Sequence, residues 1–190
     1  MKNIILIAII ILTFFISCRK STLKITEPEP SFFLDKMKGG DYTNGDGNDS
    51  FKVSDDGKNI TIGSGSNTNN YTFESDIMGI GGIYEATNSN NQDTNSSYVG
   101  VFPIGGSMHT VTMGKNEKEA LTKIIEVVGE ADSLKVVTEI LSKGNGGKLD
   151  TEAITQNLDD KKKAEVKKII EESGLNDKNK FKDYKEYKKT

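Results

Sequence analysis

Hydrophobic residues are most densely grouped at the amino terminus, where an almost unbroken apolar run extends from Ile4 to Ile16 behind the basic residue Lys2. A helix rises about 1.5 Å per residue, so this run covers only about two-thirds of the roughly 30 Å hydrocarbon core of a bilayer. Such a run behind a basic residue is typical of a cleaved export signal. The pattern therefore predicts a signal peptide over residues 1–17.

Between Phe51 and Met113 apolar and polar residues alternate in short runs, which is the pattern of half-buried strands. Asp55-Asp56-Gly57 is a good hairpin turn between the first two runs, and the polar stretch from Thr87 to Ser97 separates the fourth from the fifth. We expect five or six short antiparallel strands, with Thr87–Ser97 as a mobile hairpin tip. The runs are Phe51–Val53, Asn59–Ile62, Tyr71–Phe73, Ile83–Ala86, Tyr98–Phe102 and Met108–Val111.

The spacing of apolar residues changes to three and four after Gly114, which predicts helices. Asn116 and Glu119 resemble a capping box at the start of the first helix, and Gly174 is suited to end the last one. The expected helical segments are 116–128, 132 to the glycine-rich stop at 143–147, 151–158 and 160–173.

The region before the strands is polar. Glu27-Pro28-Glu29-Pro30 cannot continue a helix, and Gly39–Ser50 is rich in Gly, Asn and Asp. We therefore expect a disordered tether over residues 18–50, in which only Phe32-Phe33-Leu34 could dock on the domain or form a short helix.

The predicted fold class is α+β: a small antiparallel β-sheet region followed by a three- to four-helix C-terminal region, after the disordered N-terminal tether. One domain covers residues 51–175, with 51–113 β-rich and 115–175 helical. A lysine-rich tail, residues 176–190, follows it. The tail has aromatic residues spaced three apart, which favours a frayed, lightly docked helix over a binding site. These residues are Phe181, Tyr184 and Tyr187.

The apolar run ends in Phe15-Ile16-Ser17-Cys18, which resembles a lipobox, the recognition sequence of lipoprotein signal peptidase. A thiolate is the natural nucleophile for transfer of a diacylglycerol group, and the small Ser17 gives access to the bond that is cut. We expect Cys18 to become the first residue of the mature chain, with a diacylglycerol and an N-acyl lipid as its covalent groups. The alternative is a plain secretory signal in which Cys18 is incidental.

Composition narrows the function classes. With 28 acidic and 25 basic residues the chain does not suggest nucleic-acid binding. Cys18 is its only cysteine, so neither an intramolecular disulfide nor a cysteine-based zinc site can form. We expect the mature chain to be a monomer that needs no cofactor.

Residues suited to catalysis or metal binding are scarce, so we expect no enzyme and no metal site. His109 is the only histidine, and no pattern supplies a nucleophile and an orienting acid beside it, which favours a structural role. Asp41–Asp49 has alternating Asn and Asp, but Asp49 stands where a calcium loop needs Gly. Gly79–Gly82 lacks the Lys and Ser/Thr of a phosphate loop.

The signal ending in Ile16-Ser17-Cys18, the Lys/Asn/Asp-rich tether and the cysteine-free domain resemble the outer-surface lipoproteins of Lyme and relapsing-fever spirochaetes. The passage from a Gly-Gly-turned strand, Gly105 to Thr110, into a helix rich in Glu, Val, Ile and Lys is similar to the OspE/F-related lipoproteins. That resemblance implies binding of a complement regulator such as factor H, in immune evasion. No binding residue carries over from it.

Two function classes follow from these observations. One is a lipid-anchored protein of the outer membrane, exposed at the cell surface, that binds a host serum or matrix protein. The other is a structural or assembly lipoprotein that faces the periplasm and has no host ligand. The leaflet that holds the lipid on Cys18 separates the two.

For a host-binding protein we expect the interface at Thr87–Ser97 and the adjoining strands. A two-residue turn would suffice to join these strands, so a long polar loop costs ordering entropy without helping the core. A neutral surface loop that tolerates insertion is the alternative. Aromatic anchors would come from the flanking strands, if their rings are exposed. The expected contact residues are Tyr84, Thr87, Asn90, Asn91, Asp93, Tyr98 and Phe102.

Overall fold

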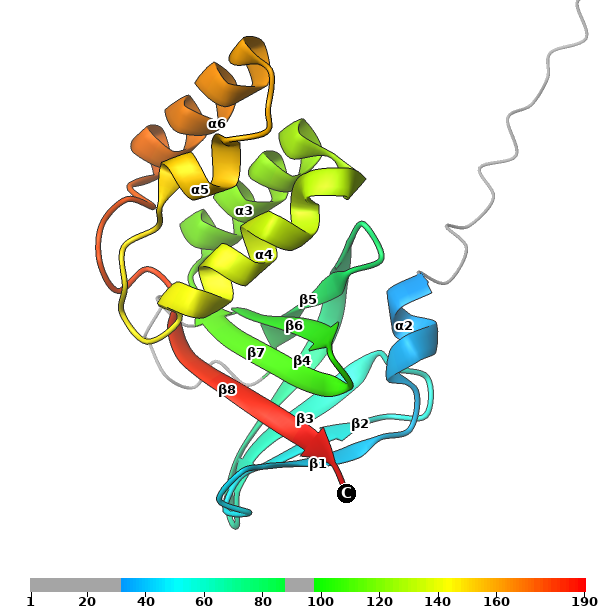
Figure 1. Cartoon of the computed structure of the whole chain (residues 1–190). Coiled ribbons are helices and arrows are strands. Elements are labelled where there is room, and N and C mark those ends of the chain that lie inside the picture. The colour runs from blue at the N-terminus through cyan, green and yellow to red at the C-terminus, as the bar shows by residue number, and fades with distance from the viewer. Residues whose placement is uncertain (1–31, 88–97) are drawn as a thin grey trace, which may run out of the picture.

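The computed structural model describes residues 32–87 and 98–190, in which eight antiparallel strands close into a barrel. All the helices except the first one described gather on one side of it (Figure 1). Consecutive strands pair with one another, and β8 pairs with both β7 and β1. The strands are β1 (Asp41–Asn44), β2 (Ser50–Val53), β3 (Asn59–Ser64), β4 (Asn67–Ile77), β5 (Gly81–Ala86), β6 (Tyr98–Ile104), β7 (Ser107–Met113) and β8 (Lys182–Lys189).

Side chains along each strand point alternately into and out of the barrel, and those that point inward fill its interior. Phe51 on β2 lies opposite Tyr42 on β1 and Ile62 on β3, so these residues point to the same side of the sheet. A barrel of eight strands is narrow enough for side chains to fill. The buried residues of this cluster are Phe33, Leu34, Met37, Tyr42, Phe51, Val53, Ile60, Tyr71, Tyr84, Val99, Val101, Met108 and Tyr187.

A second core lies between the helices and the outer face of β5, β6 and β7. The helices are α3 (Lys115–Val128), α4 (Glu130–Lys143), α5 (Thr151–Thr155) and α6 (Asp160–Ser173), and α3 packs against α6 (Figure 1). The side chains of Asp150 and Asp159 accept backbone N–H bonds at the starts of α5 and α6. Gly174 ends α6 at a left-handed φ of +66°.

The short helix α2 (Phe32–Met37) packs against the barrel core. The ring centroid of Phe33 lies 6.3 Å from that of Phe73 and 6.4 Å from that of Tyr84. This approach requires glycine at position 82, because a Cβ there would overlap the Phe33 ring. Phe33 is therefore a member of the folded domain.

The C-terminal strand closes the barrel. Tyr187 on β8 pairs with Asn44 on β1 and Met108 on β7, and its ring is buried against Phe51. Lys185 forms an ion pair with Asp49, which precedes β2. These contacts join the two ends of the described chain through β-ladders on both sides of β8.

The fold-class prediction is wrong, because the strands form a closed eight-stranded barrel and not a small sheet region. Helices α3 to α6 match the four predicted helical segments, except that α3 and α4 begin one and two residues earlier and α5 is shorter than expected. The two strands absent from the prediction, β1 and β8, are those that close the barrel. Neither has the hydrophobic alternation of a half-buried strand, because each contributes only one buried residue, Tyr42 and Tyr187.

The flanking segments also differ from expectation. The predicted tether over 18–50 contains α2, β1 and the first residue of β2. The predicted frayed helix of the tail is instead β8, in which two of the three evenly spaced aromatics, Tyr184 and Tyr187, lie on a strand. An irregularity in the pairing of β7 with β8 between Thr110 and Thr112 breaks the strict alternation of β8, so its period of two is hidden in the sequence.

Candidate functional site

The structure buries the three aromatic residues that were expected to anchor a partner, so they are not exposed anchors. Tyr84 and Phe102 are fully buried, and Tyr98 is only 8 % exposed. Tyr84 belongs to the barrel core, and Tyr98 and Phe102 belong to the core beneath the helices. A side chain needed in the core cannot also insert into a partner, so this part of the predicted interface is corrected.

Each tyrosine hydroxyl has an internal role. The Tyr84 hydroxyl donates to the Gly57 carbonyl at 2.8 Å, and burial raises the pKa of this phenol well above its usual value, with a smaller effect from the charge of Asp56. The Tyr98 hydroxyl donates to the Glu85 carboxylate at 3.3 Å, and the Lys118 ammonium lies 4.8 Å from its ring centroid.

Of the remaining predicted contact residues, Thr87 is exposed, and its backbone N–H and its hydroxyl both donate to the Asn70 carbonyl at 2.9 Å. Asn90, Asn91 and Asp93 lie outside the described residues, as does Cys18. The structure therefore assigns Thr87 a local role at the end of β5.

His109 has two polar neighbours and no carboxylate partner within the described residues. Its Nδ1 lies 2.9 Å from the Tyr184 hydroxyl and its Nε2 lies 3.3 Å from the Ile104 carbonyl, and the His109 and Tyr184 rings stack with centroids 6.0 Å apart. This arrangement links β7 to β8 and supplies no nucleophile or general base pair.

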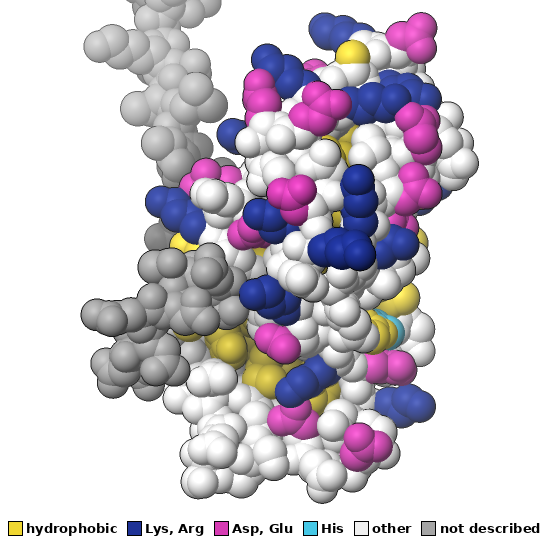
Figure 2. Space-filling view, turned by 90° about the vertical axis from the view of Figure 1, so that its left-hand side faces the viewer, with side chains coloured by type: hydrophobic (Ala, Val, Ile, Leu, Met, Phe, Trp, Pro, Cys, Tyr) yellow, Lys and Arg dark blue, Asp and Glu magenta, His cyan; other side chains and the backbone are white. Residues whose placement is uncertain are grey.

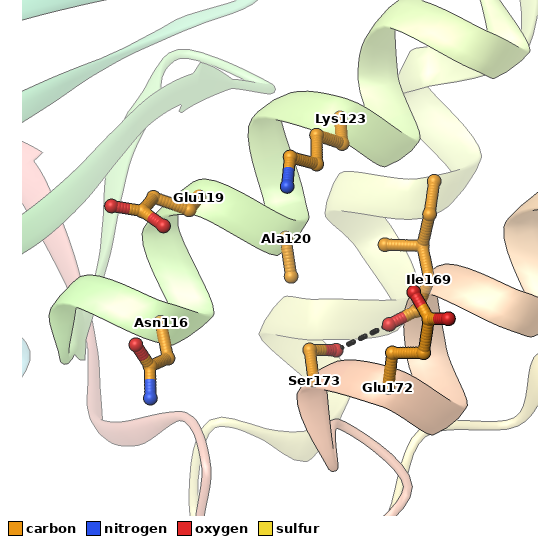
Figure 3. A pocket seen from close by; sticks show the side chains of 7 residues that line it. All are labelled: Asn116, Glu119, Ala120, Lys123, Ile169, Glu172 and Ser173. Carbon is orange, nitrogen blue, oxygen red and sulfur yellow. Dashed lines mark hydrogen bonds between the residues drawn. The ribbon is translucent and has the colours of Figure 1, made fainter.

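A groove of about 300 Å³ lies between α3 and α6 (Figure 3). Asn116, Ala120 and Lys123 share one face of α3 because they are spaced four and three apart. They face residues of α6 that are also three and four apart. The lining residues are Asn116, Glu119, Ala120, Lys123, Ile169, Glu172 and Ser173.

The base of this groove is small and apolar, and its sides are charged. Ala120 is nearly fully buried, and Ile169 packs against the helical core. The Ser173 hydroxyl is occupied, since it donates to the Ile169 carbonyl at 2.6 Å. Figure 3 shows Glu119 directed away from α6, so Lys123 and Glu172 are the charged groups nearest the gap between the helices.

The charged groups of the groove are weakly engaged. Lys123 forms no ion pair with the described part of the chain. Glu172 lies 3.7 Å from Lys168, one turn earlier on α6, and both side chains are about two-thirds or more exposed. Exposed ion pairs of this kind contribute little to the free energy of folding, on the order of 0–1 kcal/mol. A partner can therefore engage Lys123 and Glu172 at small cost.

The arrangement can form ion pairs, hydrogen bonds and apolar contacts with a partner. The groove presents an ammonium, a carboxylate and an amide over a small apolar base, without a nucleophile held by a base. Within residues 32–87 and 98–190 no group of three His, Cys, Asp or Glu side chains could hold a metal ion. In the same ranges no helix is long and apolar enough to cross a membrane.

The sequence analysis did not identify this groove. Its one sequence signal is the small Ala120 on the face that buries Leu121, Ile124 and Val128 on neighbouring turns. Nothing in the sequence shows that α6, rather than α4 or α5, lies opposite Ala120.

No protein-family model, curated protein or solved structure matched this chain.

Proposed function

We propose that this chain is a lipid-anchored protein of the outer membrane, exposed at the cell surface, that binds a host protein through the groove between α3 and α6. The observation that carries the binding proposal is the groove itself, with Lys123 and Glu172 open to a partner over the base formed by Ala120. A complement regulator is the first partner to test, because of the resemblance to the OspE/F-related lipoproteins.

The anchor proposal rests on the lipobox-like sequence that ends at Cys18. The first described element, α2, begins at Phe32. Removal of residues 1–17 therefore takes away none of the described fold. An extended chain covers at most ~3.3–3.6 Å per residue, so residues 19–31 can reach about 45 Å from a membrane surface. That length lets the domain stand clear of lipid headgroups.

The binding proposal rests on complementarity of size and charge. A groove of about 300 Å³ accepts one or two partner side chains and not a whole cofactor. Interfaces draw most of their energy from a few anchors that fill such depressions, while a charged rim selects the partner. The partner should present an apolar group flanked by an acidic and a basic side chain.

Capture from serum tests the groove. The purified chain from residue 18 to residue 190 is immobilised, and bound serum proteins are identified by mass spectrometry and quantified. Lys123→Glu and Glu172→Lys should each lower capture of the partner roughly three- to tenfold, because each replaces an attraction with a repulsion. Lys161→Glu, an equal charge change at an exposed position of α6 outside the groove, is the matched control.

Capture that is unchanged in both groove variants would reject this interface. The location is tested separately by treating intact cells with a protease. Loss of the protein from intact cells is expected, whereas protection until the outer membrane is opened would favour the periplasm-facing alternative.

A further inference from the structure

A second cavity lies where the loop after α4 meets the segment that leads into β8, on the left-hand side of Figure 1. Its volume is about 390 Å³, within the range of about 300–1,000 Å³ of small-molecule sites. The Tyr184 backbone N–H donates to the Gly144 carbonyl at 3.2 Å and joins the two segments. The lining residues are Gly144, Asn145, Gly146, Asn179, Lys182 and Asp183.

The backbone at this cavity is locally strained. Asn179 and Asp183 have left-handed φ angles of +63° and +52°, and Met78 is the one other non-glycine residue with positive φ in the described ranges. Such φ angles are uncommon in residues other than glycine, and residues that adopt them cluster at functional sites. Two of the three therefore line one cavity.

Asp183 also lies at the irregularity between β7 and β8. The step from Lys182 to Lys185 on β8 faces the shorter step from Thr112 to Thr110 on β7, so β8 has an extra residue here. Bulges of this type turn a side chain out of the regular alternation. The Asp183 carboxylate accepts a hydrogen bond from the Thr112 hydroxyl at 3.0 Å, which holds one of its oxygens and leaves the other open.

Two glycines of the loop after α4 let this loop approach the segment that leads into β8 closely. A Cβ on Gly146, whose φ is +99°, would overlap the side-chain oxygen of Asn179. Gly144 likewise lies against the Cβ of Tyr184. Backbone and primary amides therefore form most of the lining, and no apolar side chain contributes to it.

Three of the four polar side chains of this cavity are free to bind a ligand, and the fourth, Asp183, has one carboxylate oxygen open. The side chains of Asn145, Asn179 and Lys182 form no hydrogen bond or ion pair with the described part of the chain. Two amides, one ammonium and one carboxylate can donate and accept in several directions. Figure 2, in which this side of the molecule faces the viewer, shows lysine and acidic side chains interspersed over the surface.

This set of groups selects against most ligand classes. The Asp183 carboxylate repels phosphate and sulfate, and the Lys182 ammonium repels cations. An apolar ligand finds no apolar wall. A neutral polyhydroxylated ligand satisfies every group, because each hydroxyl donates to a carboxylate or amide oxygen and accepts from an ammonium or amide N–H.

We propose that the cavity formed by Asn145, Asn179, Lys182 and Asp183 binds a saccharide. Its open, polar character suits a terminal sugar residue of a glycan, held weakly and reinforced when many copies of this chain engage one glycosylated surface. This site is separate from the groove between α3 and α6, so it does not depend on the capture of a host protein there.

The test is a titration of the ¹⁵N-labelled chain, residues 18–190, followed by two-dimensional amide NMR spectra. Glucose, galactose, mannose and N-acetylglucosamine are added one at a time at millimolar concentration, and sulfate and glycine serve as charged probes. At least one sugar should move the amide signals of Gly144, Gly146, Asn179 and Asp183 in a saturable manner.

Two variants at the cavity and one elsewhere make the result specific. Lys182→Ala and Asp183→Asn should each weaken sugar binding roughly fivefold, and Asn tolerates the left-handed backbone at position 183. Lys123→Ala in the α3 and α6 groove should leave sugar binding unchanged. An unaltered melting temperature shows that each variant is folded.

The proposal is overturned if no sugar gives saturable shifts at these residues, or if sulfate or glycine binds there in place of the sugars. It is also overturned if both cavity variants bind the sugar as the parent does. Loss of serum capture in the Lys123→Glu variant with sugar binding retained would separate the two proposals experimentally.

Discussion

Two buried tyrosines in the barrel differ in what their hydroxyls contact, and that difference decides what each contributes to stability. The Tyr84 hydroxyl donates to the Gly57 carbonyl at 2.8 Å. The Tyr187 hydroxyl is buried near the polar side chains of Asp49 and Thr110 but forms no hydrogen bond of good geometry with them or with any other described residue. A buried polar atom costs free energy unless it is paired, so the same chemical group has opposite value at the two positions.

Replacing each tyrosine with phenylalanine tests this contrast. Tyr84→Phe should lower the free energy of unfolding by about 1–2 kcal/mol, because it removes a hydrogen bond and leaves the Gly57 carbonyl unpaired. Tyr187→Phe should leave the free energy within ~0.5 kcal/mol of the parent or raise it. Urea denaturation followed by circular dichroism measures both. A larger loss for Tyr187→Phe than for Tyr84→Phe would contradict the assignment.

The same tyrosines make the fold sensitive to alkali. Burial raises the pKa of both phenols well above the usual value of about 10, with smaller effects from the charges of Asp56 on Tyr84 and of Asp49 on Tyr187. Below a pH of about 10 both states keep the protons, and this contribution to stability is fully present. As pH rises beyond about 10, the unfolded chain releases protons that the folded chain retains, so the free energy of unfolding falls.

Urea denaturation at pH 9 and pH 11 measures this fall. The double variant Tyr84→Phe, Tyr187→Phe should lose less stability between the two pH values than the parent, because it lacks both phenols. All other ionisable groups are the same in the two proteins, so their effect cancels in the comparison. An identical loss in both would show that other groups cause the alkaline sensitivity.

At the scale of elements, β8 is the strand on which barrel closure depends. It pairs with β1 through three residue pairs and with β7 along most of its length. Without it, β1 and β7 would be open edges, and the Phe51 ring would lose its contact with Tyr187.

Deleting residues 182–190 should therefore abolish cooperative folding, since it removes both ladders and one of the larger fully buried side chains. The control is Lys188→Ser with Lys189→Ser, which keeps the strand and changes only exposed side chains. Thermal melting followed by circular dichroism distinguishes them. A truncated chain with the parent's melting temperature would mean that β8 docks only lightly.

At the scale of the whole molecule, the proposed lipid on Cys18 determines whether the folded domain stays attached to a membrane. A protein without its acyl chains has no stable hold on a bilayer. Neither the groove between α3 and α6 nor the cavity beside β8 would then be kept at a cell surface.

Cys18→Ala should give a chain that is unprocessed or released from the membrane, because no thiol is present to take the lipid. Metabolic labelling with radioactive palmitate, followed by membrane fractionation, measures this. The parent should carry the label and the variant should not. Label retained in the variant would reject lipidation at Cys18.

Helices α3 to α6 were predictable from the sequence, because each keeps apolar residues such as Leu121, Val137 and Val166 at helical spacing. The hairpin strands β2 and β3 were predictable for the same local reason, with the turn at Gly57 between them. Each of these sequence signals is local: it lies within a few turns of one helix or within two strands joined by a short turn. They depend only on which side chains the local backbone brings to one face.

The closure of the barrel and the composition of both sites depended on tertiary structure. Lys185 meets Asp49, and Tyr184 meets Gly144, across separations in sequence over which no periodicity operates. Whether an aromatic ring is exposed also depends on what packs over it, so Tyr98 and Phe102 could not be known as core residues before α3 and α4 were placed. Local sequence patterns determine which face of a helix or strand is apolar, whereas the tertiary structure determines which of these faces pack against one another.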